Sequence, residues 1–145
     1  MKPSPEVLAA LRQAHTIAVV GLSSNPARPS FGVARYLQSQ GYRIVPVNPR
    51  EQEVLGEQAY PSLEAIPAGL GPIEIVDVFR RSEYVPELAE QAVRMRASVF
   101  WLQEGVTHPQ AEARARDAGL LVVADTCLLK FHGRYLRPTT ENKAS

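Results

Sequence analysis

The sequence predicts a single-domain α/β fold of the doubly wound, Rossmann-like kind, with about five parallel strands and helices on both faces of the sheet. Five short apolar segments alternate with helical segments, which is typical of βαβ units. The 145 residues are enough to build one core. Right-handed crossovers between the strands then put helices on both faces. We expect residues 1–137 to form this domain and the polar residues 138–145 to be a flexible tail.

The first half of the chain contains two predicted helices and the first strand. Ser4-Pro5-Glu6 supplies an N-cap, a proline at the first helical position and an early acid, so residues 4–13 should form a helix. A buried strand follows at 16–22. Ser30 is expected to cap the next helix, which ends near Gly41 because glycine suits a left-handed C-terminal residue.

The rest of the chain continues the alternation. Apolar residues from Val85 to Val93 recur with the helical period, as expected of a helix packed on a sheet. Asp77 lies inside the apolar strand at 73–79 and should be buried and hydrogen bonded, with a ligand contact as the alternative. Trp101 should fill the core, with Gln103 pointing outward. The predicted elements are strands at 43–47, 73–79, 98–102 and 120–124, and helices at 60–66, from Val85 onward, and at 108–118.

Composition excludes several other classes of protein. Apolar residues make up 45% and charged residues 21%, as in ordinary globular proteins, and the longest apolar runs are too short to span a membrane. The N-terminus lacks the apolar segment of a secretory signal, so we expect a cytoplasmic protein. A net charge of +1 favours neither nucleic acid nor a membrane as partner. One cysteine and three scattered histidines offer no zinc spacing, so no metal is expected.

The loop after the first strand predicts an anion site. The strand leads into Gly21 and a long loop rich in Ser, Pro and Arg, and a helix follows. A helix N-terminus after such a loop presents free N–H groups and a partial positive charge, which suit a phosphate. The carboxyl ends of parallel strands share one edge of the sheet, where proteins of this fold bind ligands. The sequence therefore predicts a site for a phosphorylated ligand there.

The residues around this loop distinguish between nucleotides. Dinucleotide-binding proteins usually carry G-x-G-x-x-G after the first strand, and an acid that bonds the ribose of NAD after the second. Here only Gly21 and Gly32 are present, and the second strand ends in Asn48-Pro49-Arg50. An acid would repel a phosphate on the ribose, whereas Arg50 would attract one. The pattern disfavours NAD and favours NADP or coenzyme A (CoA).

Five segments resemble the small stand-alone CoA-binding proteins, which are similar to the N-terminal, CoA-binding domain of the succinyl-CoA synthetase alpha subunit. The resemblance spans residues 10–135. It implies a Rossmann-like module that binds CoA or acyl-CoA and stores, senses or presents it. The synthetase uses a phosphorylated histidine in a second domain that this sequence does not contain, so we expect no enzyme activity. The segments are 17–30, 41–49, 75–80, 101–105 and 122–127.

The resemblance also implies roles for individual residues. Gly21, Ser23, Pro26, Arg28 and Ser30 would form the phosphate-holding loop, with Phe31 at the start of the helix. Asn48, Pro49 and Arg50 would hold the adenosine end, with Arg50 on its 3′-phosphate. Val78, Phe79 and Arg80 would line the adenine and pantetheine side. Gln103 and Gly105 would flank the pantetheine arm.

Several alternatives stay open. The chain could be an NAD(H)- or NADP-binding regulatory module, or a subunit of an acyl-CoA enzyme that needs a partner chain. Cys127 could form a mixed disulfide with the ligand thiol or be a small buried apolar group. His132 could face the crevice as an acid or base, or be structural. Arg81 could bind the ligand or be solvated.

Overall fold

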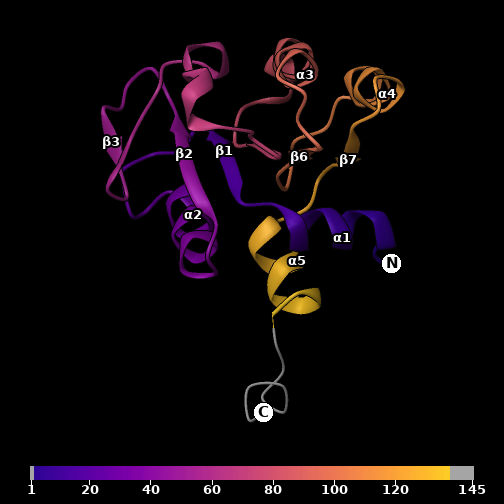
Figure 1. Cartoon of the computed structure of the whole chain (residues 1–145), viewed down its shortest axis with the longest axis horizontal. Helices are drawn as coiled ribbons and strands as arrows, with labels where there is room; N and C mark the ends of the chain where they lie inside the picture. The colour runs from indigo at the N-terminus through magenta and orange to yellow at the C-terminus, as the bar shows by residue number, and fades with distance from the viewer. Residues whose placement is uncertain (1, 138–145) are drawn as a thin grey trace.

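Helices and strands alternate along the chain in the computed structural model, which describes residues 2–137 (Figure 1). The tail predicted at 138–145 lies outside the described residues. The helices are α1 Pro5–Gln13, α2 Pro29–Ser39, α3 Val85–Arg94, α4 Pro109–Asp117 and α5 Leu128–Tyr135. The longer strands are β1 Thr16–Val20, β2 Arg43–Val47, β5 Ile75–Val78, β6 Val99–Leu102 and β7 Leu121–Val123. Shorter elements are β3 Glu53–Val54, β4 Glu57–Gln58 and the 3-10 helices η1 Leu63–Ala65, η2 Ala68–Leu70 and η3 Ser82–Tyr84.

The longer strands form one parallel sheet in the order β2-β1-β5-β6-β7. From β1 the chain first moves to one side to form β2, and it then returns past β1 to form β5. The chain therefore continues from β1 and from β5 toward opposite faces of the sheet, to α2 and α3, and this switch point is where doubly wound sheets bind ligands. The predicted fold class is confirmed.

Helices cover both faces of this sheet. α3 and α4 lie on one face, whereas α1, α2 and α5 lie on the other (Figure 1). Neighbouring strand residues point to opposite faces, so Phe100 is buried in the first core and Trp101 in the second. Trp101 fills the core as predicted. No helix within residues 2–137 is long and apolar enough to cross a membrane.

Two elements of the structure are absent from the sequence prediction. The β3–β4 hairpin was not expected, and its two-residue turn places Leu55 and Gly56 at positive φ. The last helix, α5, was also not expected. Its Phe131 ring meets the Trp101 ring edge to face, with centroids 5.1 Å apart. α5 therefore completes the core on the face that carries α1 and α2.

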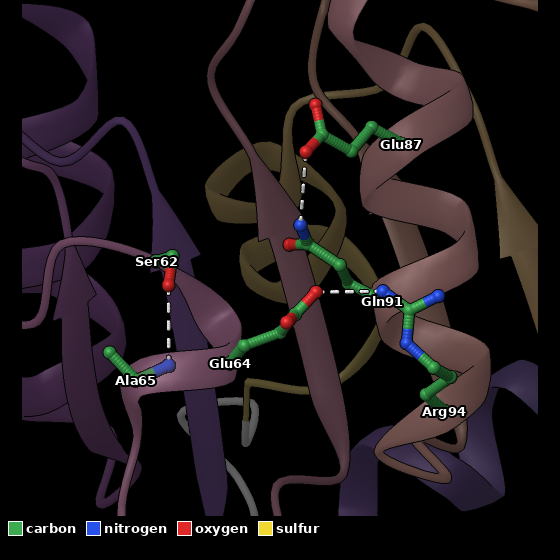
Figure 2. Close-up of polar contacts among 6 residues, drawn as sticks. All are labelled: Ser62, Glu64, Ala65, Glu87, Gln91 and Arg94. Atoms are coloured by element: carbon green, nitrogen blue, oxygen red, sulfur yellow. Dashed lines mark hydrogen bonds and ion pairs between the residues drawn. The ribbon is translucent and has the colours of Figure 1, made fainter.

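The segment after the hairpin packs against α3 (Figure 2). The hydroxyl of Ser62 accepts a backbone hydrogen bond that caps η1. Arg94 of α3 lies 2.7 Å from a carboxylate oxygen of Glu64, and this ion pair joins η1 to α3. On α3 itself, the buried Gln91 amide donates to Glu87 at 3.5 Å. These polar contacts belong to the sheet face covered by α3 and α4.

Candidate functional site

Gly21 forms the floor of the crevice at the end of β1. Its φ is +87°, and its N–H donates to the carbonyl oxygen of Val47 at 2.8 Å. A Cβ atom at this position would collide with the carbonyl oxygen of Phe79. Only glycine satisfies both the backbone angle and this close approach. Gly21 therefore allows the loops after β1 and β5 to meet backbone to backbone.

The loop after Gly21 is shaped by its own side chains. The Ser23 hydroxyl accepts from the N–H of Asn25 at 3.0 Å, and the Asn25 side chain accepts from the N–H of Ala27 at 2.9 Å. The N–H of Ser24 donates to the Glu51 carboxylate at 2.7 Å. Such turns are what Ser and Asn side chains favour. Much of the loop backbone is therefore already bonded, which leaves its side chains, especially Arg28, to meet a ligand.

The start of α2 corrects one prediction, because Ser30 is not its N-cap. The helix begins at Pro29, with Arg28 in the capping position and no side-chain cap. Proline suits the first helical position because its missing N–H would have no partner there. Ser30 lies inside the first turn, and its hydroxyl accepts from the N–H of Ser23 at 3.1 Å. Ser30 therefore ties the loop to the helix instead of starting it.

Asn48 fixes the segment after β2. Its side-chain nitrogen donates to the carbonyl oxygen of Leu22 at 3.0 Å, and its side-chain oxygen accepts from the N–H of Arg50 at 3.0 Å. Asn48 thus connects the loop after β1 with the loop after β2. This places Arg50 beside the loop that carries Arg28.

Four arginines line one pocket of about 570 Å³ in this crevice, which we call the arginine pocket. Among the described residues that line it, none is acidic. Guanidinium groups form planar, charge-assisted hydrogen bonds with phosphate, so a pocket of this composition favours an anionic ligand. Its lining is Gly21, Arg28, Asn48, Pro49, Arg50, Phe79, Arg80, Arg81 and Tyr84.

Tyr84 holds two of these arginines. Its ring lies under the Arg80 guanidinium, and its hydroxyl accepts a hydrogen bond from Arg81 at 3.3 Å. That bond from Arg81 lowers the pKa of the Tyr84 hydroxyl. Sequence reasoning missed Tyr84 and left Arg81 undecided. The available signal was their position, since both lie on the short segment that follows β5 at the ligand-binding edge.

Two of the pockets that adjoin the arginine pocket share Phe79 with it. The loop pocket, of about 360 Å³, lies over the start of α2 and is lined by Gly21, Ser23, Arg28, Pro29, Ser30, Asn48, Arg50, Glu51 and Phe79. The Cys127 pocket, of about 590 Å³, extends toward β6 and β7 and is lined by Pro29, Val33, Phe79, Arg80, Arg81, Gln103, Glu104, Gly105, Val106 and Cys127. The crevice thus follows the carboxyl edge of the sheet.

Most of the site residues predicted from the sequence come together in these pockets. The exceptions are Pro26, Phe31 and Val78. Pro26 is exposed in the loop, and Phe31 packs beneath the guanidinium of Arg35. The side chain of Val78 is fully buried in the core that faces α3. The predicted residues that line the pockets are Gly21, Ser23, Arg28, Ser30, Asn48, Pro49, Arg50, Phe79, Arg80, Gln103 and Gly105.

Gln103 and Asp77 form a buried pair below the Cys127 pocket. The Gln103 amide donates to the Asp77 carboxyl at 2.6 Å. Asp77 is buried and hydrogen bonded as predicted, and burial raises its pKa to about 7 although the bond from Gln103 acts to lower it. The prediction that Gln103 points outward is wrong, since it is only 5% exposed. Residues two apart share a face in a strand, so Gln103 follows Trp101 inward.

The lone cysteine and the last histidine occupy different ends of α5. Cys127 is half-buried, precedes the helix as its N-cap and faces the crevice. His132 is buried, and its Nδ1 lies 2.9 Å from the Tyr36 hydroxyl. Its ring also packs on Tyr42, which comes just before β2, so His132 lies at the amino edge of the sheet and does not face the crevice. Within residues 2–137, no group of three or more side chains could hold a metal ion.

An open doubly wound sheet with a polar crevice at its switch point is an architecture of nucleotide-binding α/β proteins. Within that class, residues 15–133 match the CoA binding domain, and the chain belongs to this family. The family resemblance found in the sequence is confirmed.

Relatives of the chain include both small and large proteins. It is 42% identical over 127 residues to the uncharacterised protein YneT of Bacillus subtilis, which covers 88% of this chain and 92% of YneT. It is 35% identical over 110 residues to the alpha subunit of the ADP-forming acetate–CoA ligase II of Pyrococcus furiosus. That match covers 74% of this chain but 23% of the ligase subunit, so the chain corresponds to a fraction of the larger protein.

Solved structures share the fold over nearly the whole chain. The protein designated cell-free ID.343 from Thermus thermophilus has a TM-score of 0.84 at 42% identity, and the match covers 92% of this chain and 98% of that one. A hypothetical protein from Pyrococcus horikoshii has a TM-score of 0.85 at 36% identity, covering 94% and 100%.

Proposed function

We propose that this chain binds CoA or acyl-CoA without transforming it. The observation that carries the proposal is the arginine pocket, which four arginines line at the switch point of a CoA-binding-domain sheet. CoA carries a diphosphate and a 3′-phosphate on the ribose, so it needs cationic groups at more than one place. The absence of an acid among the residues that line this pocket disfavours NAD, whose ribose hydroxyls are usually bound by a carboxylate.

The three adjoining pockets divide among the parts of CoA in this proposal. Arg28, together with Ser23 and Ser30, holds the diphosphate over the loop pocket. Asn48, Pro49 and Arg50 hold the adenosine end, with the Arg50 guanidinium on the 3′-phosphate. The pantetheine arm passes Phe79 and Arg80 and enters the Cys127 pocket between Gln103 and Gly105. No side-chain contact is proposed for Val78, which lies in the core.

Thermal unfolding with a ligand series tests the proposal. A ligand present at 100 times its dissociation constant stabilises the folded state by about 2.7 kcal/mol, which is a clear rise in melting temperature. We expect such a rise with CoA, a smaller one with dephospho-CoA, and little change with NAD or NADP. A rise with NAD or NADP and none with CoA would overturn the proposal.

The variant Arg50→Ala tests whether Arg50 binds the 3′-phosphate of CoA. A charge-assisted hydrogen bond contributes about 1.5–3 kcal/mol, so CoA should bind roughly 10- to 100-fold more weakly while dephospho-CoA binds nearly as before. Arg43→Ala is the matched control, since Arg43 is an exposed arginine at the opposite, amino edge of the same sheet. Equal losses for CoA and dephospho-CoA in the Arg50 variant would assign the 3′-phosphate elsewhere.

A further inference from the structure

The most unusual buried group of this protein is the carboxyl of Asp77. It lies at the centre of β5 and is 0% exposed. One of its oxygens accepts the hydrogen bond from Gln103, and the other has no hydrogen-bond partner among the described residues. Burying a carboxyl with an unbonded oxygen costs free energy, and buried polar groups are nearly always bonded. A role for Asp77 beyond packing would account for this cost.

Gln103 connects this buried carboxyl to the Cys127 pocket. Its amide nitrogen points to Asp77, while its amide oxygen has no hydrogen-bond partner among the described residues. That oxygen is not one of the fully buried unbonded atoms, so it keeps contact with solvent. Since Gln103 lines the Cys127 pocket, the pocket is where this contact lies. The amide therefore has its nitrogen in the core and its oxygen toward the crevice.

The carboxylate determines which end of the amide faces outward. An ionised carboxylate can only accept hydrogen bonds, so it binds the amide through the N–H₂ group. The backbone of Gln103 is also fixed, because its N–H donates to Val78 and its carbonyl accepts from Val106. With both restraints in place, the carbonyl oxygen of the side chain is a preorganised acceptor at the pocket wall.

We propose that Asp77 is a positioning residue, which holds the Gln103 side-chain carbonyl oxygen in place to accept a hydrogen bond from an amide N–H of the pantetheine arm. This inference rests on the proposed function and deepens it, because it assigns recognition of the arm to a pair separate from the arginines. Asp77 has apolar neighbours on the adjacent strands, Val19 and Trp101. The charged and titratable side chains that line the same pocket are Arg80, Arg81, Glu104 and Cys127. None of them has a hydrogen bond to Asp77 or Gln103 within residues 2–137.

Two ligands separate this role from a purely structural one. CoA has the pantetheine arm, whereas adenosine 3′,5′-bisphosphate has the nucleotide without it. Calorimetric titration at pH 8 would give both dissociation constants for the wild type, Asp77→Asn and Gln103→Leu. An Asn side chain can turn either its oxygen or its nitrogen to Gln103, so it no longer fixes the amide.

Gln91→Leu is the matched control. Gln91 is also a buried glutamine whose amide donates to a carboxylate, but it lies on α3, on the other face of the sheet (Figure 2). We expect both constants to stay within about two-fold of the wild type in this variant. Its thermal unfolding shows what the loss of a buried glutamine amide does to stability alone.

The expected result is a loss confined to CoA. A neutral hydrogen bond contributes about 0.5–1.5 kcal/mol, so Asp77→Asn and Gln103→Leu should each bind CoA roughly 2- to 10-fold more weakly, with the bisphosphate unchanged. Equal weakening of both ligands, or no weakening of CoA, overturns the role of Asp77. If Asp77→Asn does not fold, Gln103→Leu decides by the same comparison. A wild-type protein that does not bind CoA overturns the proposed function itself.

Discussion

The guanidinium of Arg80 lies over the ring of Tyr84, with its central carbon 4.0 Å from the ring centroid. Arg81, the next residue, bonds the hydroxyl of the same tyrosine. One aromatic side chain thereby contacts two adjacent cations, and Glu83 adds an ion pair to Arg81 at 3.2 Å. Tyr84 is therefore a structural determinant of the arginine pocket although it carries no charge.

Tyr84→Leu should weaken CoA binding by removing this support. A cation–π contact at an accessible site contributes about 0.5–1 kcal/mol, which corresponds to a loss of roughly 2- to 5-fold in affinity. Tyr84→Phe keeps the ring under Arg80 and removes only the bond to Arg81, so its loss should be smaller. Titration calorimetry with CoA measures both. If the two variants lose the same affinity, the hydroxyl and not the ring is what matters.

Gly21→Ala should strongly destabilise the fold. The new Cβ would meet the carbonyl oxygen of Phe79, and the residue would have to keep a φ of +87°. The positive φ alone costs about 1–2 kcal/mol, and the clash adds to it. Gly32→Ala is the control, because Gly32 lies in α2 where a Cβ would find open space, and alanine there should stabilise by up to about 1 kcal/mol. Equal urea midpoints for the two variants would contradict this account of the crevice floor.

Asp77 should make the stability depend on pH. Its pKa is raised by burial from 3.8 to about 7 in the folded state, so the folded protein holds this proton more tightly than the unfolded chain does. Stability should therefore fall as the pH rises from about 4 to about 7, by an amount on the order of 4 kcal/mol from this group. Urea unfolding of the wild type and Asp77→Asn at several pH values measures the difference. Parallel curves for the two proteins would rule out this titration.

His132 should change the pH dependence of stability in the opposite direction to Asp77, and it should not affect the affinity for CoA. Burial lowers its pKa below 6.5, so its contribution is complete above about pH 6.5 and is lost as the pH falls through the folded-state pKa. Tyr36→Phe removes the hydroxyl bonded to Nδ1 and should cost about 1 kcal/mol of stability. The affinity for CoA should not change, since His132 lies at the amino edge. A loss of affinity in Tyr36→Phe would place that edge in contact with the site.

Elements with strong periodicity or clear end signals could be predicted from the sequence. Ser4 caps α1, because a serine oxygen can accept from a free N–H of the first turn. Gly41 and Gly119 follow α2 and α4 at positive φ, which glycine adopts without steric cost. The eight residues of α5 carry no comparable signal, and this helix is stabilised by the contact of Phe131 with Trp101. The segment predicted as a helix at 60–66 forms only the 3-10 turn η1. Whether such short segments form helices depends on tertiary packing, and the local sequence pattern carries no information about that packing.

The site could be predicted where strand ends determine it. Gly21, Asn48 and Arg80 each follow the carboxyl end of a strand, so topology alone gathers them at one edge. Tyr84 and the inward turn of Gln103 depend on side-chain contacts made after the strands pair. Ser30 has the residue type of an N-cap but the position of a loop anchor, because Pro29 already starts the helix.

The pair of Asp77 and Gln103 also couples a proton to a ligand. A pantetheine arm that binds the outward-facing carbonyl oxygen of Gln103 also favours the ionised form of Asp77. Binding would therefore release the proton that Asp77 carries. Because burial raises the pKa of Asp77 to about 7, saturation with CoA near neutral pH would release part of this proton. Heats of binding would then differ between buffers of different ionisation enthalpy. Acidification would in turn loosen the hold on the arm, so a carboxyl in the middle of a sheet would make occupancy of the crevice depend on pH.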